Sequence, residues 1–185
     1  MELPFKLLEH PFYKDWECGK VTMEQLAKYA ESYKDFIELM PEFWKKISKG
    51  FSVDNTLIKK IIAEETTHID LWNNWTEKLP EIEDFPKLIK IIECFNNFTP
   101  SELLGAVHAF EVQQPEVAKS KKNGLIKFYG FEIGDLKYFE EHEKEDEHIA
   151  YGIELYKNKA NKKEFESGFN KASELLYQGL DLYLN

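Results

Sequence analysis

Cysteine is scarce in this chain: Cys18 and Cys94 are the only two among 185 residues. They form neither a Cys-x-x-Cys pair nor a disulfide framework, so we expect free thiols in a reducing compartment. Long apolar runs are missing as well, since no window approaches the roughly 20 residues of a membrane span. The start, MELPFKLLEH, has no apolar signal core. These absences predict a cytoplasmic protein with no membrane partner.

Basic residues are in the minority, with 24 Lys and Arg against 34 Asp and Glu and a net charge of −10. This balance argues against nucleic acid or an anionic membrane as a partner and favours a soluble protein. Hydrophobic residues make up 43% of the chain and aromatic residues 15%, which excludes a disordered polypeptide. The length is typical of one domain, and we expect residues 1–185 to form a single one.

Strand-like alternation, internal repeats and low-complexity tracts are also absent. Apolar residues recur instead at spacings of three and four, which predicts an all-α bundle of about seven or eight helices. Capping boxes at Thr22–Gln25 and Thr99–Glu102 indicate two helix starts, and Asp54 is the expected cap of another. Breaks or kinks are expected at three prolines, which are Pro11, Pro41 and Pro115.

Three of these helical segments place acidic residues or histidines where the periodicity requires apolar ones. They are AEETTHIDLW (63–72), AFEVQQPEV (109–117) and YFEEHEKEDEHI (138–149). A carboxylate or imidazole directed into a helical core is costly unless it is paired, and a metal ion pairs several at once. The pattern therefore predicts a non-haem dinuclear metal site inside the bundle.

Helical spacing selects the candidate ligands within these segments. Glu64 and Glu65 both precede His68 by about one turn. Glu111 ends an apolar helix. His108 on the same helix is interpreted as a hydrogen-bonded core residue or as support for a ligand. A continuous helix over 135–157 would place His142 on one apolar stripe with further residues. The other members of that stripe are Phe139, Asp146, Ile149, Ile153 and Tyr156.

The order of several motifs resembles one known family. LLEHPFYKDW, TMEQLAKYAESYKDFIELMP, EETTHIDLW, FEVQQPEVAKSKKNGLIKFYGF and YFEEHEKEDEH occur in that sequence. They resemble the chlamydial protein associating with death domains and its relatives among the haem-oxygenase-like di-metal oxidases. That group is related in fold to pyrroloquinoline quinone synthesis protein C and thiaminase II. The resemblance implies a haem-oxygenase-like helical bundle and leaves a homodimer open.

The resemblance implies six metal ligands: Glu64, His68, Glu111, His142, Asp146 and His148. Two spacings depart from the family pattern. Glu64 and His68 are closer together than usual, so Glu65 competes with Glu64. The Asp146–His148 spacing is one residue short, and an ideal helix would direct His148 about 120° away from His142. Tighter 3₁₀ winding would restore it, and a second register would use Glu141, Glu145 and His148.

Close relatives in this family are associated with oxygen-dependent synthesis of para-aminobenzoate, the folate precursor. That route consumes one of the protein's own tyrosines and takes nitrogen from one of its lysines. The matching residues are Tyr13 in HPFY, Tyr29 in KYAESY and Lys121 in AKSKKNGL. The resemblance implies two metal ions, Fe(II)/Fe(III) or an Fe/Mn pair, with O₂ as co-substrate.

Other functions remain open at this point. A related oxidase would act on a diffusible amino acid or fatty acid, and a degenerate metal site would leave a protein-interaction module. A metal-free thiaminase would need a pocket cysteine on the Glu111 helix, which has none. A cofactorless quinone-forming oxidase would need a basic pocket, which the acidic clusters oppose.

Overall fold

The computed structural model describes residues 1–184, in which helices provide all the regular secondary structure. The expected all-α fold class is confirmed, and no helix in this range is long and apolar enough to cross a membrane. Several expected helices are divided, and short 3₁₀ turns lie near both ends. The α-helices are α1 (Pro11–Glu17), α2 (Met23–Ile37), α3 (Met40–Phe51), α4 (Thr56–Thr76), α5 (Ile89–Asn97), α6 (Pro100–Glu111), α7 (Gln114–Phe128), α8 (Lys137–His142), α9 (Asp146–Asn158) and α10 (Lys162–Gly179).

Side-chain caps determine where several helices begin. Both predicted capping boxes are present, at the starts of α2 and α6. The predicted cap of α4 is wrong by one residue, because Asn55 rather than Asp54 caps it. The Asn55 Oδ1 accepts a hydrogen bond from the Ile58 amide at 2.9 Å, while Asp54 forms an exposed ion pair with Lys59. The side-chain carbonyl of Asn55 therefore accepts a hydrogen bond from an amide that has no partner within the helix.

The three prolines mark new helices. Pro11, Pro41 and Pro115 each occupy the first or second position of α1, α3 or α7. Proline has no amide hydrogen to donate and a fixed φ, and both properties suit the first turn. The kink expected at Pro41 is therefore a complete break, with α2 ending at Ile37.

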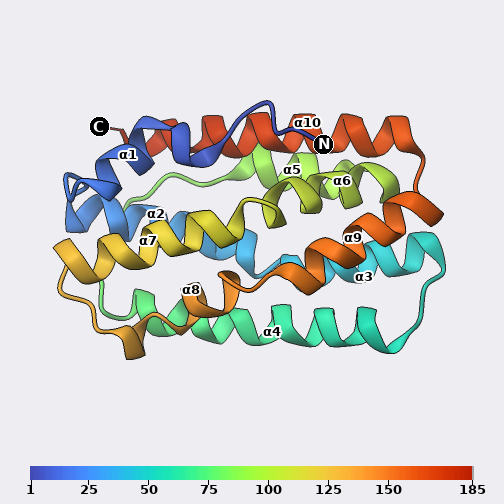
Figure 1. The fold of residues 1–185 in the computed structure, drawn as a ribbon. Helices are drawn as coiled ribbons and strands as arrows, with labels where there is room; N and C mark the ends of the chain where they lie inside the picture. The colour runs from blue at the N-terminus through green and yellow to red at the C-terminus, as the bar shows by residue number, and fades with distance from the viewer. Residues whose placement is uncertain (185) are drawn as a thin grey trace.

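Close packing of α10 on α6 fixes one wall of the interior. A Cβ atom at Gly168 would lie 1.9 Å from the Glu102 carbonyl oxygen, and one at Gly105 would lie 2.0 Å from that of Phe165. Only glycine allows the two backbones to approach so closely. Figure 1 shows α10 and α4 on opposite sides of the bundle, with α7, α8 and α9 between them. Helix α4 packs against α2, α3 and α8, and α9 packs against α6.

A break divides the helix that the sequence predicted over 135–157. Helix α8 ends at His142, a turn covers residues 143–145, and α9 begins at Asp146. The predicted stripe assumed uninterrupted steps of about 100° per residue. The turn changes that register, so His148 is buried while Asp146 is exposed and Ile153 is 37% exposed. The prediction that Asp146 and Ile153 lie on the buried face is wrong.

Candidate metal centre and tyrosine cluster

Six buried side chains from α4, α6, α8, α9 and the turn before α9 converge inside the bundle. They form two groups, and in each group one donor atom per residue lies within 4.8 Å of the others. The first group is His68, His142 and Glu145, and the second is Glu65, Glu111 and His148. Counted as whole residues, all six are at most 7% exposed. Burial of so many ionisable groups is costly unless charge is compensated.

His148 lies at the centre of the second group. Its Nδ1 is 2.8 Å from Glu145 Oε2, 3.3 Å from Glu65 Oε1 and 3.7 Å from Glu111 Oε1. Among residues 1–184, neither this Nδ1 nor Glu111 Oε1 has a hydrogen-bond partner of good geometry. The His68 Nδ1 is likewise unpartnered within the described chain. Buried polar atoms without partners are rare, and their convergence indicates a place for a bound cation.

His142 is held with one ring nitrogen free for a ligand. Its Nδ1 donates a hydrogen bond to the Tyr138 carbonyl oxygen at 2.7 Å, which leaves Nε2 as the acceptor, 3.5 Å from Glu145 Oε1. Burial, reinforced by the nearby His68, lowers the pKa of His142 to about 3. The imidazole is therefore neutral, which is the form that binds metals.

Two of the three buried carboxyl groups resist ionisation. Burial and the neighbouring Glu111 raise the pKa of Glu145 to about 8, and burial and Glu65 raise the pKa of Glu111. Glu65 differs, because the adjacent imidazoles of His148 and His68 outweigh its burial and lower its pKa to about 2. Nitrogen and carboxylate donors together suit iron and manganese. The residues present therefore fit two such ions.

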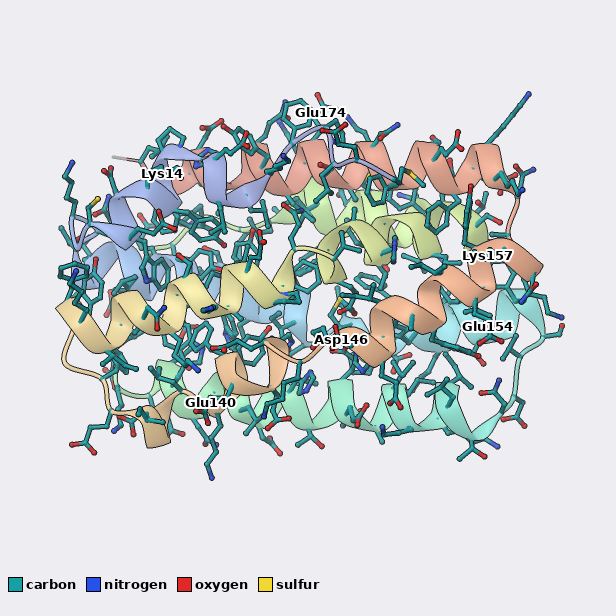
Figure 2. All side chains as sticks on the ribbon, in the orientation of Figure 1. Lys14, Glu140, Asp146, Glu154, Lys157 and Glu174 are labelled. Atoms are coloured by element: carbon teal, nitrogen blue, oxygen red, sulfur yellow. The ribbon has the colours of Figure 1, made fainter. Side chains whose placement is uncertain are left out.

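The structure brings together four of the predicted ligands and leaves two outside. His68, Glu111, His142 and His148 belong to the two groups. Asp146 lies exposed at the start of α9, next to the break after α8 (Figure 2). The prediction that Asp146 faces the site is corrected because the break turns it towards solvent.

Two neighbouring glutamates take the places expected for Asp146 and Glu64. Glu145 follows the second register considered in the sequence, three residues before His148, whereas Glu141 is exposed and takes no part. On α4, Glu65 is 3% exposed and belongs to the second group. The Glu64 side chain is 39% exposed, and its Oε2 lies 3.2 Å from Nε2, the outer nitrogen of His148. The spacing to His68 allowed both glutamates, so only burial separates them.

A second cluster joins α1, α2 and α7. The hydroxyl oxygens of Tyr13 and Tyr29 are 3.2 Å apart, and the Lys121 amine donates to the Tyr29 hydroxyl. The Lys121 Nζ also lies 5.0 Å from the centre of the Tyr13 ring. All three side chains are buried. Gly124 lets α7 approach α1, since a Cβ there would lie 2.6 Å from Trp16 Cδ1.

The space inside this cluster is small. Its cavity has a volume of about 10 Å³, which is room for roughly one water molecule. Tyr13, Tyr29, Lys121 and Tyr138 are among the residues that line it. A diffusible amino acid or fatty acid does not fit in this space.

Aromatic rings connect the two clusters. The Tyr138 ring stacks on His142 at a centroid distance of 4.0 Å and meets Trp72 edge-on at 4.8 Å. The Trp72 ring lies 6.2 Å from that of Tyr29. Sequence reasoning missed Tyr138 and Trp72 as part of the site, because aromatic residues at helical spacing also describe an ordinary core.

Burial lowers the pKa of Lys121 from 10.5 to about 7, which predicts a pH-dependent stability. Between these values the unfolded chain binds the proton that the folded chain rejects, so the free energy of unfolding rises with pH. The cost of the buried charge is present in full below about pH 7. We expect Lys121→Met to be more stable than the wild type near pH 6, with an advantage that shrinks towards about pH 10. Denaturant unfolding across this range measures it, and a pH-independent difference would contradict it.

Relatives of this chain occur among proteins of known function. No protein-family model matches the chain. A 4-aminobenzoate synthase from Chlamydia muridarum is 30% identical over 200 residues, which cover 96% of this chain and 84% of the relative. The chain belongs to the 4-aminobenzoate synthase family. A further member, from Nitrosomonas europaea, is 30% identical over 167 residues, which cover 76% of this chain and 68% of that relative.

A solved structure shares the fold at low identity. A TenA homolog from Pseudomonas syringae pv. tomato matches with a TM-score of 0.76 at 15% identity, over 96% of this chain and 86% of the other. The chain therefore has a TenA-like helical architecture, in agreement with the expected all-α bundle. At this identity the match carries no information on activity.

Proposed function

We propose that this chain is an oxygen-dependent 4-aminobenzoate synthase that consumes its own side chains. Tyr13 supplies the ring and Lys121 supplies the nitrogen. The observation that carries the proposal is the sealed contact of the Tyr13 phenol, the Tyr29 phenol and the Lys121 amine, in a cavity of about 10 Å³. The names of the relatives supply the product.

The chemistry of the product matches these two side chains. The ring of 4-aminobenzoate and its carboxyl carbon correspond to the ring and Cβ of one tyrosine. Formation of the product breaks the Cα–Cβ bond of Tyr13. One O₂ supplies both oxygens of the new carboxyl group, and Cα takes a hydrogen, so that glycine is left at position 13. The Cε–Nζ bond of Lys121 also breaks, its nitrogen replaces the phenol oxygen on the ring, and that oxygen leaves as water. The lysine Cε is oxidised to an aldehyde in this step, which consumes a further half equivalent of O₂. Each chain can therefore make one molecule of product.

Lys121 is suited to deliver the nitrogen. A pKa near 7 leaves much of the amine neutral at neutral pH, with a lone pair available for bond formation. The hydrogen bond to Tyr29 holds the amine beside the Tyr13 ring. Buried neighbours exclude bulk water, so competing hydrolysis is suppressed and the groups are held near their reacting positions.

The two groups of His and Glu side chains would hold the metal ions of this enzyme. His68, His142 and Glu145 would bind one ion, and Glu65, Glu111 and His148 the other. Bound iron, or iron with manganese, would supply the redox chemistry that reduces O₂. Tyr13 does not touch these groups, so its oxidation requires an electron to leave the phenol over a distance. The rings of Tyr29, Trp72, Tyr138 and His142 provide a continuous path for that electron.

Isotope labelling tests the proposal. Protein produced with ring-¹³C tyrosine and ε-¹⁵N lysine would be loaded anaerobically with Fe(II) and Mn(II), then given O₂ and a reductant. We expect 4-aminobenzoate that carries both labels, at no more than one molecule per chain. Mass spectrometry of the released product and of the remaining protein measures both.

Unlabelled free tyrosine and lysine in the same reaction provide the control. They should not dilute either label, because the cavity has no room for a second amino acid. Dilution of the labels, or repeated turnover by one chain, would overturn the self-consuming route and favour an oxidase with a diffusible substrate.

A further inference from the structure

A surface cavity of about 230 Å³ leads to the buried His and Glu groups. Its lining consists of Lys60, Glu64, His68, Glu141, Lys144, Glu145, Glu147 and His148. His68, Glu145 and His148 belong to the two buried groups, and the other five residues lie towards the surface. The cavity therefore connects solvent with side chains that are otherwise enclosed.

A lysine lies at the outer end of this cavity. Lys60 on α4 pairs with Glu147 on α9, and its Nζ is also 3.6 Å from Glu64 Oε1. The side chains of all three residues are 39–51% exposed. Lys60 thus links α4 to α9 across the outer end of the cavity. Its ammonium group lines the cavity beside the carboxylates of Glu64 and Glu147.

Glu64 connects this outer pair to the interior. Its Oε1 faces Lys60, while its Oε2 is 3.2 Å from the His148 Nε2. On the inner side of the cavity, the Nδ1 of His68 has no hydrogen-bond partner within residues 1–184, and this side chain is only 9% exposed. One carboxylate therefore bridges the solvated lysine and the buried donors.

We propose that this cavity is the route by which divalent cations reach the buried donors. Glu64 is the carboxylate that receives the ion, and Lys60 is the cation that must move aside. This inference rests on the metal centre of the proposed function. It gives Glu64 a role in uptake and leaves the lasting coordination to Glu65.

Electrostatics determines the expected effects. Even without Glu145, whose pKa is raised to about 8, the other three glutamates of the lining outnumber its two lysines and raise the local concentration of cations. Lys60 is half-exposed, so its ammonium opposes a divalent ion through a water-like dielectric, and at a separation of about 8 Å this alters a rate roughly three- to tenfold. Both contributions weaken as salt screens the exposed charges.

Stopped-flow uptake of Co(II) by metal-free protein tests this route, followed by elemental analysis after desalting. We expect Lys60→Met to take up Co(II) roughly three- to tenfold faster than the wild type, because the opposing charge is gone. Glu64→Gln should take it up more slowly by a similar factor. The final metal content should be unchanged in both variants, and added salt should slow uptake by the wild type.

Two residues of the same helix provide matched controls. Lys59→Met removes an exposed lysine that pairs with Asp54, and Asp70→Asn removes an exposed carboxylate, and neither residue lines the cavity. Both controls should take up Co(II) at the wild-type rate.

Equal rates for Lys60→Met, Glu64→Gln and the wild type would overturn the route while the metal centre stands. A loss of final metal content in Glu64→Gln would also overturn it, since Glu64 would then be a ligand. A wild-type chain that binds no ion would overturn both the route and the metal centre.

Discussion

Replacing Glu111 and His142 together by alanine is expected to reduce metal binding from two ions per chain to none. Each substitution removes one donor from a different group, so that two side chains remain in each. Two protein donors are too few for the sites that enzymes use to hold iron or manganese against desalting. Anaerobic loading with Fe(II) and Mn(II), desalting and elemental analysis measure the loss. Full metal content in the double variant would show that the six donors have been misassigned.

Single substitutions around the break between α8 and α9 sharpen this test. Glu145→Ala should lose metal, whereas Asp146→Ala, one residue later and exposed, should retain it. His108→Gln serves as a control for the loss of a buried histidine. His108 lies one turn before Glu111 on α6, but it packs on Phe165 and belongs to neither group. The opposite result at positions 145 and 146 would restore the sequence-based assignment.

The helical bundle and the general nature of the site could be predicted from the sequence. Threonine caps and apolar periodicity are local signals, so Thr22 and Thr99 were placed correctly as helix caps. His68, Glu111 and His142 were recognisable because each interrupts a buried face, and each is buried in the structure. Such an interruption is costly in free energy unless something compensates for it, which is why it indicates a site.

The exact set of side chains could not be predicted around the turn that precedes α9. A helical projection assumes a constant rotation per residue, and the turn at residues 143–145 violates that assumption. No glycine or proline marks this turn. It consists of Glu143, Lys144 and Glu145, which are residues that also suit a helix. Assigning Glu145 rather than Asp146 to the candidate site therefore required the three-dimensional structure. On α4, two adjacent glutamates shared the same spacing to His68, and packing alone buried Glu65.

The tyrosine cluster shows a different limit. Nothing local to Tyr13, Tyr29 or Lys121 distinguishes them from other tyrosines and lysines, and only the family resemblance selected them. The structure adds their mutual contact and the burial that lowers the pKa of Lys121. It also adds Trp72 and Tyr138 between the two clusters. Contacts between helices that are distant in the sequence cannot be inferred from periodicity.

Expression of this chain in bacterial cells that lack their own para-aminobenzoate synthesis is expected to restore growth without added para-aminobenzoate. Tyr13→Phe should abolish this rescue because the phenol is the proposed precursor, and Lys121→Arg should abolish it because a guanidinium cannot donate the amine. Lys121→Met should fail in the same way, although it removes a buried charge and should stabilise the fold near neutral pH. Tyr29→Phe should weaken rescue, since it removes the hydroxyl that contacts both groups. Growth rate and product released into the medium measure these outcomes.

The expected loss of stability in these variants is too small to explain a complete loss of rescue. Tyr13→Phe removes one buried hydroxyl with a single hydrogen-bond partner, at a cost of about 1 kcal/mol. Tyr177→Phe is the matched control, because Tyr177 packs on His10 and Phe5 away from Lys121, and it should rescue fully. Rescue that survives both Tyr13→Phe and Lys121→Arg would contradict the self-consuming route. Because the Glu111 and His142 double variant should also fail, rescue by that variant would separate product formation from the metal centre and leave the tyrosine cluster to act without it.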